Sequence, residues 1–409
     1  MKVLAKNRVA FSIIIAALIL IFGTVAIFWA RGFKLNFKDR TIDRTGLLVA
    51  SSVPTGAEIY LDDRLTSATD TNIAYLEPKI YKIRIQKDGF TTWEKDIDIR
   101  ADLATEIKAL LFPLAPEIKP LTTTGAANPV LSPDGTKIVY GTSGDRGGLH
   151  LMTLSDRPIP FRSDLRLLVK NSSGFDFTKS LFIWSPDSKQ VIARFEQEDG
   201  SVLANLLIDN TDKSDQDPGD ITGSLAATLN SWQEELIAKA QTQAVSAPDA
   251  VKNATAEAKI VGSSESVVSS PTTQPASPAK RGELPTTNYQ LNYYPTGLIF
   301  SPDEEKILYK NKEGQFKVYD LKNKREVSLP NFADFINISW FPDSSHLVVA
   351  QKDLISIIEA DGANKMTVFS GKFENGFVFG HPSGTRIIIL TTLTQTEGNP
   401  ANLYAVNLR

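Results

Sequence analysis

The chain has 409 residues, a formal net charge of −3 and no cysteine. This length exceeds one ordinary domain, so we expect two or three domains. The near-neutral charge argues against a general nucleic-acid-binding protein. Without cysteine there are no disulfides, thiol nucleophiles or thiolate metal sites, and three histidines (His150, His346 and His381) are too few for a histidine-rich metal centre.

Residues 9–30, VAFSIIIAALILIFGTVAIFWA, contain no charged side chain. About 20 apolar residues cross a bilayer as a helix. The segment is longer than the apolar core of a cleavable signal peptide, and Trp29 suits the aromatic belt at a membrane interface. The pattern predicts a cytoplasmic head at residues 1–8 and an uncleaved transmembrane helix at residues 9–30. A buried core helix is the alternative.

The basic side chains that flank this segment do not settle its orientation. Lysine and arginine are more numerous after the segment than before it, which by itself would leave the rest of the chain in the cytoplasm. Long domains, however, are translocated largely regardless of such charges. We therefore predict a single-pass cell-membrane protein with its N-terminus in the cytoplasm and its bulk outside.

Residues 47–113 follow a linker at residues 31–46 and alternate apolar and polar side chains in short runs. In YKIRIQ, the apolar Tyr81, Ile83 and Ile85 alternate with polar side chains, while PTGA and KDGF supply turns. Alternation with period two indicates half-buried strands. We expect a compact antiparallel β-domain in which Trp93 is a core residue. A ligand platform is the alternative role for Trp93.

This region resembles a PEGA domain, a small β-sandwich of prokaryotic envelope proteins. The tetrad that names the family corresponds to Pro54, Thr55, Gly56 and Ala57, with threonine in place of glutamate. The family's GY pair corresponds to Gly89-Phe90, and its usual DG turn is replaced by Asp62-Asp63. The resemblance implies an extracytoplasmic spacer or adhesive module rather than an enzyme.

Five copies of one turn sequence punctuate residues 117–409. They read SPDG, SPDS, SPDE, FPDS and HPSG, with their prolines at Pro133, Pro186, Pro302, Pro342 and Pro382. Serine, proline and glycine at the first, second and fourth places suit a type I turn, and the apolar runs on both sides make each copy a β-hairpin. A third strand follows at GLHLMTL, VLANLLID, FKVYDLK, ISIIEAD and NLYAVNL.

The last two intervals between these prolines are 40 residues each, the period of a four-stranded propeller blade. The repeats are similar to the WD40-like SPDG repeats of TolB-type β-propellers, and the whole chain resembles PEGA-domain envelope proteins of uncultivated small-genome bacteria. NLYAVNLR has no fourth strand after it, and PEIKPLTTT, before the first copy, has no blade of its own. We predict that these two ends share the last blade, which protects the strand edges where the ring closes.

The interval between Pro186 and Pro302 is too long for one blade. Leu225, Leu229, Trp232 and Leu236 recur at helical spacing after Ser224, a helix-capping residue type, which predicts a helix at residues 222–240. Residues 241–287 are rich in alanine, serine, threonine and proline, which predicts a disordered insert. A sixth blade in this interval is the alternative. The sequence thus shows five blade motifs and is compatible with a propeller of five or six blades.

Two sets of acidic residues are candidates for chemistry. The turn aspartates Asp134, Asp187, Asp303 and Asp343 form either a carboxylate cluster or the caps of their own turns. The second role is favoured because copies of one turn lie around a rim, not in one pocket. The acidic stretch at residues 209–220 lacks the ligand spacing of an EF-hand loop, which favours a solvated loop over a calcium site.

Other motifs in the sequence are weak. Glycosylation patterns at Asn171, Asn253 and Asn337 are attributed to chance in a prokaryotic protein. The sequence contains no Gly-rich phosphate loop and no nucleophile elbow. No catalytic, cofactor-binding or metal-binding residues are therefore predicted, and no cofactor.

Together these patterns predict a mainly β, membrane-anchored extracytoplasmic binding or scaffold protein. Its PEGA-like β-sandwich holds a β-propeller away from the bilayer. The expected partners are the lipid bilayer, through the N-terminal helix, and a protein or cell-surface polymer, through the propeller, with no nucleic acid. The alternative is an envelope enzyme with its active site in the propeller channel, which would need convergent acids or a base at the channel mouth.

Overall fold

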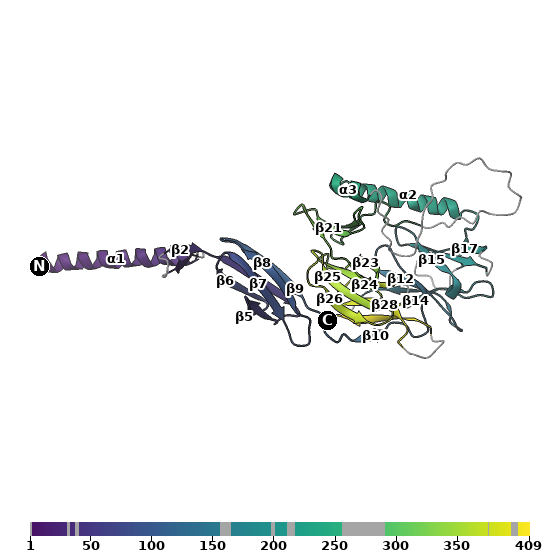
Figure 1. Cartoon of the computed structure of the whole chain (residues 1–409), viewed down its shortest axis with the longest axis horizontal. Helices are drawn as coiled ribbons and strands as arrows, with labels where there is room; N and C mark the ends of the chain where they lie inside the picture. The colour runs from purple at the N-terminus through teal and green to yellow at the C-terminus, as the bar shows by residue number, and fades with distance from the viewer. Residues whose placement is uncertain are drawn as a thin grey trace. The chain divides into compact units, whose positions relative to one another are not determined.

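The computed structural model describes residues 2–30, 33–36, 41–155, 165–197, 201–210, 217–255, 291–374, 376–393 and 400–409. The chain divides into two compact units, Met1–Ala115 and Pro116–Arg409 (Figure 1).

The first unit begins with helix α1 (Lys2–Ala30). Strands β1 (Phe33–Asn36) and β2 (Thr41–Arg44) follow and pair as an antiparallel hairpin, so the predicted linker at residues 31–46 contains a small sheet. The alternation in FKLN and TIDR suits such strands. In the part of the chain that the structure describes, no helix combines the length and apolar character needed to cross a membrane. The transmembrane helix at residues 9–30 stays a prediction.

The rest of the first unit is a two-sheet β-sandwich. One sheet holds β3 (Gly46–Val53), β6 (Thr71–Leu76) and β9 (Ala104–Leu110). The other holds β4 (Glu58–Leu61), β5 (Arg64–Ala68), β7 (Lys79–Gln86) and β8 (Trp93–Ile99). The inward residues of both sheets form one apolar core that includes Leu48, Ile59, Ile83 and Trp93. Trp93 is 2% exposed, which confirms its predicted core role.

The prediction of an entirely antiparallel domain is wrong at one pair of strands. Strands β3 and β9 run parallel, with Leu48 opposite Thr105 and Val53 opposite Leu110. Alternation of apolar residues specifies that a strand is half-buried, but not the direction of its neighbour. At the turn between β4 and β5, Asp62 and Asp63 both have positive φ, 49° and 63°. Aspartate tolerates this left-handed conformation, so the turn forms without the family's glycine.

The second unit contains five four-stranded antiparallel sheets. Blade 1 consists of β11 (Ala127–Leu131), β12 (Lys137–Thr142), β13 (Gly148–Thr153) and β14 (Leu165–Lys170). Blade 2 consists of β15 (Leu181–Trp184), β16 (Gln190–Glu196), β17 (Val202–Asp209) and β18 (Gly219–Asp220). Blade 3 consists of β19 (Ile299–Phe300), β20 (Lys306–Lys310), β21 (Phe316–Asp320) and β22 (Arg325–Ser328). Blade 4 consists of β23 (Phe335–Trp340), β24 (His346–Gln351), β25 (Leu354–Glu359) and β26 (Met366–Ser370).

Blade 5 joins the two ends of the second unit. It consists of β27 (Val378–Gly380), β28 (Arg386–Thr391), β29 (Asn402–Asn407) and β10 (Ile118–Pro120). Strand β10 comes from PEIKPLTTT and pairs with the C-terminal β29, with Ile118 opposite Val406. The backbone N–H of Asn407 also donates to the carbonyl of Glu117 at 2.8 Å. The predicted closure of the ring is confirmed.

The central strands of the blades are buried on both faces, and each face meets a different neighbour. In β12, Val139 packs in a cluster with blade 2, whereas Ile138 and Tyr140 pack in a cluster with blade 5. Blades 3 and 4 share a further cluster around Leu308 and Leu347. Blades 4 and 5 approach so closely that a Cβ on Gly380 would lie 2.5 Å from Pro342 Cδ.

The two inserted helices, α2 (Leu225–Ala244) and α3 (Asp249–Thr255), cover the facing surfaces of blades 2 and 3. Leu229 and Trp232 of α2 pack on the blade 2 face that carries Ile192. Val251 of α3 packs on the blade 3 face that carries Ile307 and Tyr309. Figure 1 shows the helices end to end on one side of the propeller. Helices therefore lie in the interval where a sixth blade was the alternative, since the described residues of the second unit form five sheets.

The boundaries of the insert need correction. Helix α2 continues to Ala244 and α3 begins at Asp249 after a short turn, so residues 241–255 are ordered and largely helical although disorder was predicted. The cause is tertiary, because Ala247 and Val251 are buried against blade 3. Ser224 precedes α2 but makes no side-chain capping hydrogen bond; its hydroxyl donates back to the carbonyl of Ile221. The remainder of the predicted disordered insert, residues 256–287, lies outside the described residues.

Removal of residues 402–409 should destroy the ring, because it deletes β29 and leaves β10 and β28 with unpaired edges. The deletion removes three buried side chains, Leu403, Val406 and Leu408. The burial of each contributes about 1.5–3 kcal/mol to folding, whereas the net stability of a typical domain is about 5–15 kcal/mol. We expect aggregation or loss of cooperative unfolding by size-exclusion chromatography and thermal circular dichroism. Deletion of Arg409 alone is the control. A truncated protein that unfolds cooperatively at the wild-type temperature would contradict the closure.

Trp232→Ala should lower the free energy of unfolding by about 3 kcal/mol, because it removes a large side chain from the contact between α2 and blade 2 and leaves a void there. Glu234→Ala, on the exposed side of the same helix, should change it by less than about 0.5 kcal/mol. Urea unfolding followed by far-ultraviolet circular dichroism measures both. Equal, small effects would show that α2 does not complete the packing between blades 2 and 3.

Candidate functional site

The five repeated turns share one backbone geometry. In each, the N–H of the fourth residue donates to the carbonyl of the first, at 2.8 Å for Gly135 to Ser132 and 3.1 Å for Ser344 to Phe341. The fourth residue has positive φ in every copy: 71° at Gly135, 58° at Ser188, 59° at Glu304, 57° at Ser344 and 65° at Gly384. Glycine adopts this conformation without cost, whereas the other residue types need a compensating contact.

The turn aspartates cap their own turns. Asp134 Oδ1 accepts hydrogen bonds from the Ser132 hydroxyl at 2.6 Å and the Thr136 N–H at 2.9 Å, and its Oδ2 lies 3.1 Å from Lys137 Nζ. Asp187 and Asp303 repeat the pattern with the hydroxyls of Ser185 and Ser301. These contacts support the turn-capping role and do not bring the aspartates into one cluster.

The two divergent copies preserve this arrangement with different side chains. In the fourth copy, phenylalanine replaces the serine donor, and Asp343 Oδ2 instead lies 2.7 Å from His346 Nδ1. In the fifth copy, His381 stands in the place of serine and Ser383 in the place of aspartate. Their Nδ1 and Oγ atoms are 2.8 Å apart. Two of the three histidines therefore belong to turns.

The turn aspartates remain ionised at neutral pH. Burial acts to raise the pKa of Asp134, but the hydrogen bonds from Ser132, Thr136 and Lys137 outweigh it, so the pKa lies below 3.8. The same balance lowers the pKa of Asp187, Asp303 and Asp343. A general acid or base works best with a pKa near the operating pH, so these carboxylates do not suit that role.

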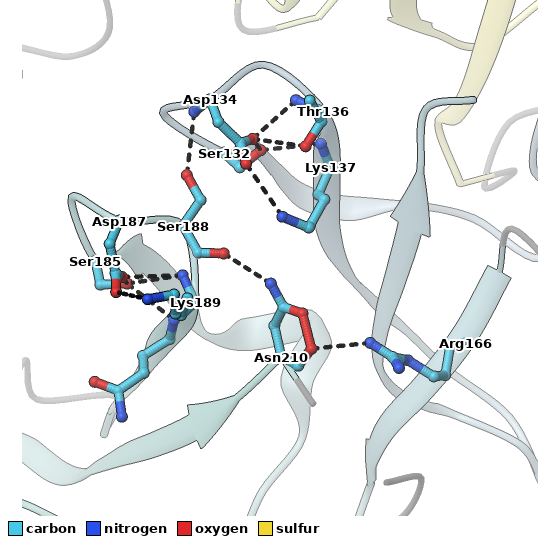
Figure 2. A network of polar contacts seen from close by, with 11 residues as sticks. Ser132, Asp134, Thr136, Lys137, Arg166, Ser185, Asp187, Ser188, Lys189 and Asn210 are labelled. Carbon is cyan, nitrogen blue, oxygen red and sulfur yellow. Dashed lines mark hydrogen bonds and ion pairs between the residues drawn. The ribbon is translucent and has the colours of Figure 1, made fainter. Parts of the chain in front are cut away.

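Hydrogen bonds also link one turn to the next blade. The N–H of Asp134 donates to the Ser188 hydroxyl at 3.1 Å, and the Ser188 carbonyl accepts from Asn210 Nδ2 at 2.7 Å (Figure 2). The N–H of Asp303 makes the equivalent bond to Ser344, at 3.0 Å. Serine at the fourth turn position, where glycine is unstrained, thus gains an inter-blade bond.

A tryptophan adds a second bond at the same two interfaces. Trp184 Nε1 donates to the Val130 carbonyl at 3.1 Å, and Trp340 Nε1 donates to the Ile299 carbonyl at 3.0 Å. Neither inter-blade contact was predicted from the sequence. A signal for them exists, because tryptophan two residues before the proline and serine two residues after it occur together in the second and fourth copies alone.

The other candidates do not converge on a site. His150 stacks on Tyr140 with ring centroids 5.8 Å apart, away from the turns. Asn171 and Asn337 use their side-chain oxygens to accept backbone N–H bonds, and Asn253 lies in α3. In the acidic stretch, Asp220 accepts from Thr222, while residues 211–216 lie outside the described residues. Across the described residues, no group of three or more histidine, aspartate or glutamate side chains could hold a metal ion.

A cavity of about 300 Å³ lies where the ring closes, between blades 5 and 1. Its lining residues lie before or at the start of β11, at the end of β12 and β28, or before β15, β27 and β29. The cavity therefore sits at the strand ends opposite the repeated turns. Small and hydroxyl residues predominate: Thr124, Gly125, Ala126, Ala127, Asn128, Gly141, Thr142, Ser143 and Thr178. Glu374, Leu390, Pro400 and Ala401 complete the lining. None of these residues was predicted from the sequence as part of a site.

Comparison with known proteins identifies the first unit. Residues 45–113 match the PEGA domain family, which confirms the resemblance seen in the sequence. No match was found among curated protein sequences. The five sheets and their closure define the second unit as a β-propeller. Residues 45–113 are thus a PEGA-type domain. The described residues of the second unit form five blades and two inserted helices.

Among solved structures, the chain is similar to a putative TolB from Agrobacterium tumefaciens, with 12% identity and a TM-score of 0.24 over 73% of this chain and 79% of that chain. It is also similar to TolB from Acinetobacter baumannii, with 14% identity and a TM-score of 0.19 over 80% of this chain and 56% of that chain. A third similar structure is an oligogalacturonate lyase in complex with manganese, with 9% identity and a TM-score of 0.29 over 90% and 98% of the two chains.

The lowered pKa of the turn aspartates predicts an acid-sensitive propeller. Because the unfolded chain binds protons near pH 3.8 and the folded chain only below it, the stability that these groups contribute is present above pH 3.8. It is lost as the pH falls through the lower, folded-state values. Asp134→Asn should make urea unfolding less dependent on pH between 5 and 2.5, and Asp134→Ala should cost about 1 kcal/mol at pH 7. An unchanged pH profile for Asp134→Asn would contradict the assignment.

Proposed function

We propose that this protein is an extracytoplasmic binding or scaffold protein, anchored in the membrane by its N-terminal helix, that presents the propeller to a protein or cell-surface polymer. The observation that carries the proposal is the use of the turn carboxylates. Asp134, Asp187, Asp303 and Asp343 are held in their own turns, with their pKa values lowered. This use of the acidic residues in the repeats supports a structural role for them over a catalytic one.

The exposure of α1 supports the membrane anchor. Phe11, Leu20 and Phe22 are 65%, 72% and 71% exposed, and other large aliphatic side chains between residues 11 and 27 are exposed as well. A helix that is apolar on all sides requires an apolar environment, because no face of it is suited to water. The proposed span at residues 9–30 would place these side chains in lipid.

The match to a PEGA domain at residues 45–113 supports the extracytoplasmic side, since that family occurs on envelope proteins. The enzyme alternative needs convergent acids or a base at the channel mouth. The cavity at the ring closure carries one carboxylate, Glu374, and no histidine or lysine among its lining residues. This composition favours binding over acid–base chemistry.

Protease added to intact spheroplasts should digest the chain beyond residue 45 and leave only the N-terminal helix protected. The physical reason is that a single span with a short basic head leaves both folded units outside. Immunoblotting with a C-terminal tag measures the loss, and a cytoplasmic protein serves as the control for intact cells. Full protection before lysis, with digestion after it, would place the propeller in the cytoplasm and overturn the proposal.

A further inference from the structure

The cavity between blades 5 and 1 is held open by a rigid frame. The N–H of Gly125 and the hydroxyl of Thr122 both donate to Asn402 Oδ1 at 2.9 Å, which fixes the segment before β11 to the start of β29. Asn128 Nδ2 donates to the carbonyl of Ser180 at 2.9 Å, which fixes the same segment to blade 2. The walls therefore come from a closed ring and not from a free loop.

Thr142 supplies an unused polar group to this cavity. Its residue is only 4% exposed, and period two places its side chain on the same face of β12 as Ile138 and Tyr140, toward blade 5. Its carbonyl accepts from Asn171, but its hydroxyl makes no hydrogen bond within the described residues. The hydroxyl oxygen is not among the fully enclosed polar atoms that lack a partner, and Thr142 lines the cavity, which places the hydroxyl at the cavity surface. A hydroxyl that no described protein group bonds is available to a ligand, whose polar group can replace water there.

The other polar groups of the cavity are acceptors and hydroxyls. Because the two N–H bonds of Asn128 Nδ2 point to the carbonyls of Thr178 and Ser180, its Oδ1 remains as an acceptor. Glu374 Oε1 accepts from the Thr392 hydroxyl at 3.1 Å and keeps further acceptor capacity. No lysine, arginine or histidine lines the cavity. The carboxylate therefore disfavours anions, and the set matches a ligand rich in hydroxyl donors.

The volume of the cavity and its apolar lining further restrict the class of ligand. The volume of about 300 Å³ lies at the lower limit of small-molecule sites. Ala126 and Leu390 are buried in the apolar cluster beneath, which gives the cavity an apolar floor. A sugar ring offers hydroxyls at its edge and C–H groups on its face, so it matches both surfaces.

We propose that this cavity binds one uncharged sugar unit, supplied by a cell-surface glycan. The source of the sugar rests on the proposed extracytoplasmic function; the binding itself does not. Thr142, Asn128 and Glu374 hold the hydroxyls, and Ala126 and Leu390 contact the ring face.

The test uses the full chain in nanodiscs, because glycosidic detergents would compete. Glucose, galactose and N-acetylglucosamine are the neutral probes, and glucuronate is the anionic probe. Saturation-transfer NMR and calorimetric titration should show binding of at least one neutral sugar and markedly weaker binding of glucuronate. Thr142→Val, which keeps the shape and removes the hydroxyl, should weaken binding about fivefold or more. Thr142→Ser, which restores a hydroxyl, should bind like the wild type.

Three results would overturn the proposal: no binding of any neutral sugar, equal binding of glucuronate, or unchanged binding by a folded Thr142→Val variant. Retention on insoluble envelope glycan, with elution by the free neutral sugar, supports the glycan as source. Binding of the free sugar without retention on glycan would overturn that source. Protease accessibility measures the topology separately, so failure of sugar binding is distinguishable from failure of the proposed function.

Discussion

The pairing of β10 with β29 is the interaction on which the propeller depends. Three residues, Ile118–Pro120, complete the sheet that the last three strands begin. Each blade buries its two faces against different neighbours, as Val139 and Tyr140 do in β12, so an open ring would expose faces as well as strand edges. The same closure places Asn402 against Thr122 and Gly125. The strand pairing that closes the ring therefore also positions the wall of the cavity.

The ring does not require every position to be a sheet. Between blades 2 and 3, α2 and α3 provide the apolar surfaces instead, with Trp232 on one side and Val251 on the other. What a blade needs from its neighbour is mainly apolar area of suitable shape, because buried side-chain faces provide most of the contact between blades. The strand-to-strand hydrogen-bond ladders run within each sheet, which allows a helix pair to stand between two sheets.

The two ends of the propeller have different chemistry. At the turn end, charged side chains such as Asp134 and Asp187 are satisfied within their turns, and Ser188 and Ser344 link neighbouring blades. At the opposite end, Thr142 and Glu374 line one small cavity, and the Thr142 hydroxyl has no hydrogen-bond partner among the described residues. Side chains that are satisfied internally stabilise a fold, whereas a nearly buried, unsatisfied group marks a place for a ligand. We therefore expect ligand binding at the end of the propeller opposite the repeated turns.

The sequence by itself determined the five hairpins, their third strands, the closure by the two ends and the core role of Trp93. These features follow from local turn chemistry and from side-chain periodicity, which neighbouring residues carry. Tertiary structure alone decided the parallel pairing of β3 with β9, the extension of α2 to Ala244 and the helix α3 after it, and the cavity. Strand direction depends on a partner distant in the chain, and Val251 is helical where blade 3 buries it. The lining of the cavity comes from six separate segments of ordinary residues such as Thr142, so no local pattern could indicate it.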